Sequence, residues 1–325
     1  MPRQTAIMRD IPHELSSGPF TIQRAYELGL SPKLLRGPRF RTPWPGVRVL
    51  REHPDTFVER CRAASLVLPT EATFTHHTAL VLGGWLTPQG GRYRPEDPSP
   101  GTSLHVSVPM GTARPRGRGL VAHQWHPEPD DVIGLAGLRV SSPARTWCDL
   151  GAADEPLTDL VILADALRRR GVGVGRLRAR LDAWEGRRGA LVLRTALRRS
   201  RDRVDSPMET RLRLLLEDAG LPEPVVNEWV RAADGTPLHC PDLSWPQWRV
   251  AVDYDGRHHN DRDDERDVSA GRASDWRARQ DQSRRDLLAE DGWAFRVFTS
   301  FDVFRQPAIL IERVRRALSL AGAPV

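Results

Sequence analysis

The chain has 325 residues, with 48 basic against 42 acidic side chains, a formal net charge of +6 and a sequence pI near 10.0. This length predicts two or three domains, each with room for a core. No apolar run approaches the roughly 18 residues that span a bilayer, and the N-terminus lacks a signal-peptide core, so we expect no membrane contact.

Arginine supplies nearly all of the positive charge, because Lys33 is the only lysine. A basic excess favours polyanionic partners such as DNA, although an arginine bias with abundant Ala, Gly and Pro can equally reflect a GC-rich genome. The three cysteines, Cys61, Cys148 and Cys240, lie far apart and form no CxxC pair. This usage is typical of reduced thiols in a cytoplasmic protein.

Residues 1–87 form the first predicted domain. Thr21 can cap a first helix, and Ser31-Pro32 is typical of the cap and first position of a second. A basic hairpin bent by Pro and Gly follows, with a short strand at 47–50. Two helices and such a hairpin predict a winged helix whose arginines suit phosphate contacts. The alternative is a small helical domain with a solvated loop. The expected nucleic-acid-binding residues are Arg36, Arg39, Arg41 and Arg48.

A helix is expected at about 56–68, and a second helical pattern contains His76 and His77. Adjacent histidines on a helix do not share a face, and no third ligand follows at the next turn. The local spacing therefore favours a cap or packing role over a zinc site.

The opening helices, the turn Pro45-Gly46-Val47 and the helix His77-Thr78-Ala79…Gly84 resemble AbiEi-type antitoxin proteins. The resemblance implies a winged-helix DNA-binding repressor of a type IV toxin–antitoxin locus. It also implies a cognate toxin as a further partner.

The middle of the chain divides into a predicted small α+β domain, 88–165, and an arginine-rich helical linker, 166–205. The domain begins with a Pro/Gly-rich loop, and strands are expected at 104–108, 120–125, 131–133 and 138–140, before a helix that opens at Ser142-Pro143. From 168 to 205 there are thirteen arginines against four acidic residues. These arginines could follow a phosphate backbone or form a solvated face.

The last predicted domain, 206–325, has an α/β pattern. Helices are expected at 207–219, 275–291 and 302–319, and strands at 225–231, 237–244, 249–255 and 293–299. A loop at 257–272 is rich in Asp and Arg. The whole chain is thus a mixed α/β protein, α+β overall, with an αβββαβ order in its C-terminal part.

Carboxylates gather on the second strand of a predicted hairpin. Strand alternation places Asp253 and Asp255 on one face, and Asp242 lies across the turn. Converging carboxylates repel one another, and Mg²⁺ or Mn²⁺ would relieve the repulsion. The alternative is a strand that runs into a solvated Asp-Gly turn.

Several motifs in this domain resemble a very-short-patch-repair-endonuclease-like domain of the PD-(D/E)XK superfamily. They are Ser206-Pro207-Met208-Glu209, Pro241-Asp242-Leu243, Val252-Asp253-Tyr254-Asp255-Gly256 with His259, Asp281 with Arg284 and Arg285, and Gly292-Trp293. The resemblance implies a restriction-endonuclease-like fold and metal-dependent phosphodiester hydrolysis, with no small organic cofactor. Its implied catalytic residues are Glu209, Asp242, Asp253, Asp255, His259 and Arg284, and Arg285 would bind phosphate.

Two departures from the family pattern favour a non-catalytic alternative. Asp253 stands where the family has Glu, and Asp255 occupies the place of the superfamily's lysine. A degenerate nuclease fold on an AbiEi-like regulator would explain both.

Overall fold

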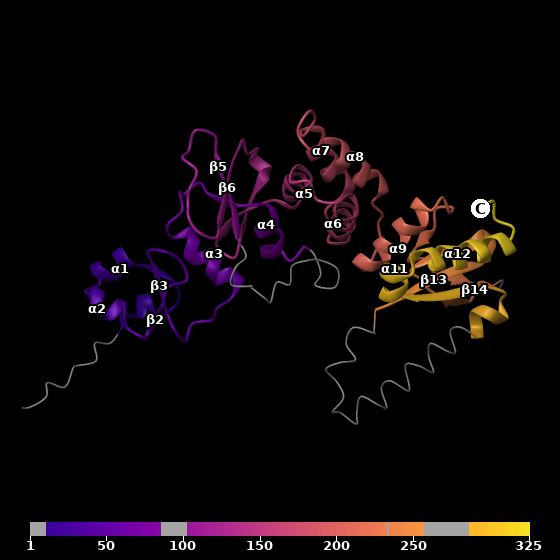
Figure 1. Ribbon diagram of the computed structural model, residues 1–325, viewed down its shortest axis with the longest axis horizontal. Helices are drawn as coiled ribbons and strands as arrows, with labels where there is room; N and C mark the ends of the chain where they lie inside the picture. The colour runs from indigo at the N-terminus through magenta and orange to yellow at the C-terminus, as the bar shows by residue number, and fades with distance from the viewer. Residues whose placement is uncertain (1–10, 86–102, 233, 257–285) are drawn as a thin grey trace, which may run out of the picture. The chain divides into compact units, whose positions relative to one another are not determined.

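The computed structural model describes residues 11–85, 103–232, 234–256 and 286–325. It divides into two compact units, residues 1–150 and 151–325 (Figure 1). Several predictions lie outside the described residues: most of the loop at 88–103, the acidic loop at 257–272, most of the helix at 275–291, and the side chains of His259, Asp281, Arg284 and Arg285.

The first unit begins with two short helices and a small sheet. Thr21 and Ser31 accept hydrogen bonds from Arg24 N (3.1 Å) and Leu34 N (3.3 Å), so both predicted caps are confirmed. Lys33 is exposed on the second helix. The sheet order is β1-β3-β2. The elements are η1 His13–Leu15, β1 Phe20–Thr21, α1 Ile22–Glu27, α2 Pro32–Leu35, β2 Phe40–Arg41 and β3 Val47–Leu50.

A five-stranded mixed sheet forms the rest of this unit, in the order β6-β5-β4-β8-β7. β5 pairs in parallel with β6, and β4 with β8. β4 and α4 come from the range predicted as the first domain, yet β4 lies at the centre of this sheet. The elements are α3 Phe57–Ser65, β4 Thr73–Phe74, α4 His76–Leu82, β5 Leu104–Pro109, β6 Leu120–Trp125, η2 Pro129–Asp131, β7 Val132–Leu135, β8 Leu138–Ser141 and α5 Pro143–Ala152.

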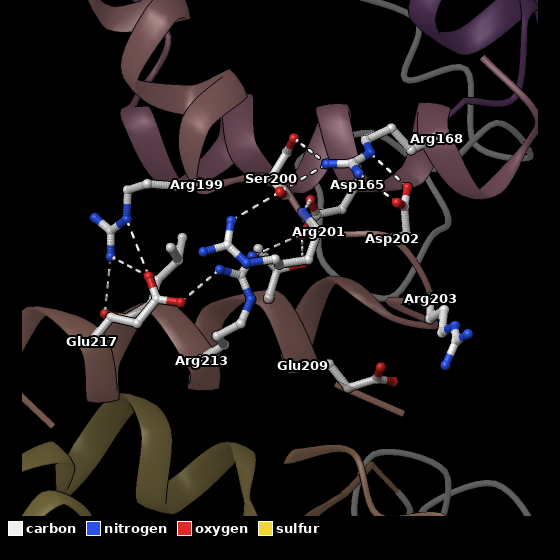
Figure 2. A network of polar contacts seen from close by, with 12 residues as sticks. Asp165, Arg168, Arg199, Ser200, Arg201, Asp202, Arg203, Glu209, Arg213 and Glu217 are labelled. Atoms are coloured by element: carbon white, nitrogen blue, oxygen red, sulfur yellow. Dashed lines mark hydrogen bonds and ion pairs between the residues drawn. The ribbon is translucent and has the colours of Figure 1, made fainter. Parts of the chain in front are cut away.

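Helices open the second unit: α6 Leu157–Arg169, α7 Val174–Asp182, α8 Ala190–Arg199 and α9 Pro207–Asp218. The arginine-rich stretch packs here through ion pairs, as Arg168 with Asp202 (2.6 Å) and Arg199 with Glu217 (3.1 Å) illustrate. Arg213 on α9 is fully buried and bonds Asp165 on α6 at 3.0 Å (Figure 2). These arginines therefore hold helices together, which leaves fewer of them for phosphate.

A four-stranded sheet in the order β14-β13-β12-β9 forms the core of the second unit. Its three antiparallel strands are followed by β14, which is parallel to β13. α9, α11 and α12 cover one face, where Leu212, Val252 and Phe298 are buried (Figure 1). The elements are β9 Val225–Val226, β10 Val230–Arg231, β11 Pro237–His239, β12 Leu243–Trp245, η3 Pro246–Trp248, β13 Val250–Asp255, β14 Ala294–Thr299, α11 Ser300–Arg305 and α12 Pro307–Leu320.

Three predicted elements of this unit are broken in the structure. Asn227 has a left-handed φ of 45° and separates β9 from β10, which pairs with β11. Pro241 has no N–H for a ladder bond, and the strand predicted at 237–244 stops around it. Pro307 likewise divides the helix predicted at 302–319.

The described residues thus form a mixed α/β protein with several sheets, as expected. Every helix within them is too short or too polar to cross a bilayer.

Candidate functional site

Three polar residues form a row across the sheet of the second unit. Leu243 on β12 pairs with Val252 on β13 and with Val226 on β9. One residue farther on, just beyond the ends of β9 and β12, Asn227 and Asp242 continue this alignment beside Asp253 of β13. Asn227 N–H donates to Asp242 O (3.2 Å), and Asp242 N–H donates to Asp253 Oδ1 (3.1 Å). This hydrogen bond makes Asp242 and Asp253 neighbours, as the predicted hairpin implied.

A histidine outside the predicted motifs is hydrogen-bonded to Asp253. His239 ends β11, and its Nε2 lies 2.7 Å from Asp253 Oδ2. The imidazole edge packs on Phe295 with ring centroids 5.6 Å apart, which fixes its orientation. Both oxygens of Asp253 therefore have a hydrogen-bonding partner, while the side chain keeps 25% of its surface exposed.

The first turn of α9 places Glu209 beside the row. Ser206 caps this helix by accepting from Glu209 N–H (3.2 Å). Glu209 Oε2 in turn accepts from Asp205 N–H (2.8 Å) and from Asn227 Nδ2 (2.7 Å). Only 6% of Glu209 is exposed, and burial raises the pKa of its carboxyl. Asn227 thus links Glu209 to the row.

The electrostatics of the site centre on Asp242. Burial, followed by the neighbouring charges of Glu209 and Asp253, raises the pKa of Asp242 to about 8. The hydrogen bond from Tyr254 N–H to Asp242 Oδ2 (2.6 Å) opposes this shift. At neutral pH the Asp242 carboxyl is therefore mostly protonated unless a cation or another positive group stands beside it.

A hard divalent cation fits the chemistry of this donor set. Mg²⁺ is commonly held by one or two carboxylates with water and phosphate completing its shell. Asp242 and Asp253 can supply two such oxygens. In the described parts of the chain, no three carboxylates place an oxygen within 4.8 Å of one another. An ion bound directly by Asp242, Asp253 and Asp255 together would require these side chains to move.

The four predicted nucleic-acid arginines of the first unit differ in their surroundings. Arg41 bonds Asp55 (2.8 Å) and two backbone carbonyls, and Arg48 bonds the carbonyls of Leu35 (3.1 Å) and Val47 (2.9 Å). Arg36 and Arg39 are exposed. The first pair supports the hairpin, and the second pair is available to a phosphate backbone.

His239 had a partial signal in the sequence, whereas Asn227 had none. His239 stands three residues before Asp242, close to a motif already singled out. The spacing alone places His239 on the same strand as Asp242, whereas in the structure it belongs to a separate hairpin. The position of Asn227 depends on the turn that ends β9, and the sequence pattern did not predict this turn.

Comparison with known proteins adds relatives of undescribed function. No protein-family model matches the chain, and no solved structure matches it. Two uncharacterised proteins of Mycobacterium tuberculosis, from strains CDC 1551 and H37Rv, are each 27% identical over 283 residues. Each alignment covers 86% of this chain and 92% of the relative, so the similarity extends over both units.

Proposed function

We propose that this protein binds DNA and that its second unit is a divalent-metal-dependent endonuclease of the very-short-patch-repair-endonuclease-like kind. The observation that carries the proposal is the contact of Asp242, directly before β12, with Asp253 on β13, next to the buried Glu209. In the described residues, α9 is followed by the sheet strands β9, β12, β13 and β14, with β14 parallel to β13, and this arrangement is compatible with the restriction-endonuclease-like fold that the sequence motifs imply.

Each residue of the site has a separate part in the proposal. Asp242 and Asp253 would hold Mg²⁺ or Mn²⁺, and such an ion makes bound water more acidic and screens charge on a scissile phosphate. His239 fixes the orientation of Asp253 through its 2.7 Å bond. Glu209, whose charge acts on Asp242, would orient water. Arg36 and Arg39 would bind the DNA backbone and add affinity without sequence information.

Plasmid cleavage tests the proposal directly. Supercoiled DNA is incubated with the full chain in Mg²⁺ or Mn²⁺, and nicked and linear products are quantified. We expect cleavage by the natural protein and its loss in Asp242→Asn and Asp253→Asn. Both changes keep the side-chain shape and replace a carboxylate that could bind the cation with a neutral amide. Glu209→Gln should reduce activity by roughly 10–100-fold, as expected of a group outside the inner shell.

The control for these variants is Asp182→Asn, because Asp182 is exposed at the end of α7 in the same unit. This variant should cleave like the natural protein. Equal cleavage by Asp242→Asn, Asp253→Asn and Asp182→Asn would instead contradict the assignment and indicate a contaminating nuclease.

A second candidate function is a non-catalytic AbiEi-like regulator that binds DNA, and in a toxin–antitoxin locus acts with a cognate toxin. The partners of Asp253 favour it, because both carboxylate oxygens already accept hydrogen bonds. Asp255 in place of a lysine points the same way. DNA binding by gel shift, with no cleavage in either metal, would favour the regulator over the nuclease.

A further inference from the structure

Three histidines from separate elements meet in the first unit. His76 begins α4, His105 lies on β5 and His123 lies on β6, and one ring nitrogen from each lies within 4.8 Å of the others. Among the described residues they are the one group of three His, Cys, Asp or Glu side chains that meets this distance. Nothing in the proposed nuclease site requires them.

The sheet brings two of these histidines together. β5 and β6 are parallel, with His105 opposite Val121 and Ser107 opposite His123. His105 and His123 are therefore diagonal neighbours on one face, within reach of long side chains. Their nearest nitrogens, His105 Nδ1 and His123 Nε2, lie 3.2 Å apart. Two imidazoles bound to one tetrahedral Zn²⁺ at 2.0–2.1 Å would have nitrogens roughly 3.3–3.4 Å apart.

The start of α4 carries the third histidine to the same place. Thr75 N–H donates to His105 O (3.0 Å), and His105 N–H donates to Thr78 Oγ1 (2.8 Å). The His76 ring then stacks on His123 with centroids 4.1 Å apart. His76 also has a left-handed φ of 51°, a conformation that costs energy for a residue with a side chain and is often found at functional sites.

Burial keeps the imidazoles of the cluster neutral, and the neighbouring positive groups add to its effect. Burial, followed by the neighbouring histidines, lowers the pKa of His76 to about 2 and that of His105 to about 4. Burial and Arg114 lower the pKa of His123. Arg145 also acts on His76, but Asp131 (2.7 Å) and Asp149 (2.8 Å) bond its guanidinium. A neutral imidazole has one unprotonated nitrogen that can coordinate a metal. His105 Nδ1 and His123 Nε2 are hydrogen-bonded to each other, so the shared proton would have to move to another ring nitrogen when both bind an ion.

We propose that His76, His105 and His123 bind one transition-metal cation of the Zn²⁺ class through three imidazole nitrogens. Imidazole donors suit Zn²⁺, Co²⁺, Ni²⁺ and Cu²⁺, whereas Mg²⁺ prefers oxygen. Three histidines leave a fourth coordination position for water or an anionic ligand. Binding of a common ion would require the stacked rings of His76 and His123, which are 16° from parallel, to turn until their nitrogens point to one position. The ion would join α4 to β5 and β6, and thereby stabilise the sheet.

The test measures Zn²⁺ and Co²⁺ binding by the full chain after chelator treatment and dialysis. It is done in the Asp242→Asn, Asp253→Asn background, so that the carboxylate site cannot contribute. We expect one equivalent of bound metal, a visible absorption band of tetrahedral Co²⁺, and a rise in Tm with Zn²⁺. His105→Gln and His123→Gln should each weaken binding by more than about tenfold, because even outer-shell partners contribute that much.

His126→Gln is the matched control, because His126 is exposed just beyond β6 and outside the cluster. It should bind Zn²⁺ like its parent. Absence of bound metal in the parent, or unchanged binding in His105→Gln, would overturn the proposal. Should the glutamine variants fail to fold, zinc X-ray absorption on the parent decides: a shell with three imidazoles supports the site, and an oxygen-only shell rejects it.

Discussion

Asp242 gives the protein a specific dependence of stability on pH. Its pKa in the folded chain is about 8, against about 3.9 in an unfolded chain. The folded state therefore binds this proton more tightly, and ionisation of Asp242 destabilises it. Its contribution to stability is fully favourable below pH 4 and falls as the pH rises from about 4 to about 8. The same charge repulsion would make a bound cation stabilising.

Asp242→Asn should remove this dependence. The amide can still accept from Tyr254 N–H but carries no charge, so in metal-free buffer at pH 8.5 we expect a higher Tm than in the natural protein. For each 1 kcal/mol by which loss of the charge stabilises the folded state, Tm should rise by roughly 2–4 °C in a unit of this size. Thermal unfolding from pH 4 to pH 9 measures it, with Asp182→Asn as the control. A Tm difference that does not change with pH would contradict the assigned pKa.

His239 should act on Asp253 rather than on substrate. If the second unit is a nuclease, His239→Gln should reduce cleavage by roughly 10–100-fold and weaken binding of the activating metal to a similar degree. A titration of activity against Mn²⁺ separates the two effects, because raised metal should restore part of the lost rate. A pure loss of maximal rate, with unchanged metal dependence, would instead indicate a direct role in proton transfer.

At the scale of elements, the buried contact between α6 and α9 makes a sharp prediction. Arg213→Met would leave Asp165 without its charged partner in a buried setting, and breaking such a pair costs about 3–5 kcal/mol. Arg194→Met is the control, since Arg194 and Glu185 form an exposed pair whose loss costs about 1 kcal/mol or less. Urea unfolding of both variants measures the difference. Equal losses would show that burial does not strengthen the first pair.

The elements also show what a sequence pattern can predict. Apolar alternation predicted β13, and the predicted hairpin placed Asp242 across the turn from the strand that carries Asp253. The register, with Leu243 opposite Val252, did not follow from the sequence pattern, because it depends on the residues that form the turn. The histidine cluster could not be found this way. Its members are joined by the parallel pairing of β5 with β6 and by the position of β4 beside β5, neither of which leaves a local signal. A search for a third ligand one helical turn from His76 or His77 covers residues of one helix only. The partners of His76 lie on the strands β5 and β6.

At the scale of the whole molecule, the proposed DNA binding and the structural support of the hairpin should depend on different arginines. Arg36→Ala with Arg39→Ala should weaken DNA binding for all sequences and reduce the salt slope by about 0.9 for each lost phosphate contact. Arg41→Ala should mainly lower stability, because Arg41 holds the segment that follows β3. Fluorescence anisotropy at several salt concentrations measures the first effect. Arg139→Ala, on an exposed position of β8, is the control.

Lys33 offers a practical route to that measurement. It is the only lysine of the chain, it is exposed on α2, and Arg36 follows it by three residues. An amine-reactive fluorophore can therefore be attached there without engineering cysteines, the α-amino group being the other target. A dye at this position lies next to the expected path of the nucleic acid. Its emission should change when duplex is added to the natural protein and remain constant in the Arg36→Ala, Arg39→Ala variant.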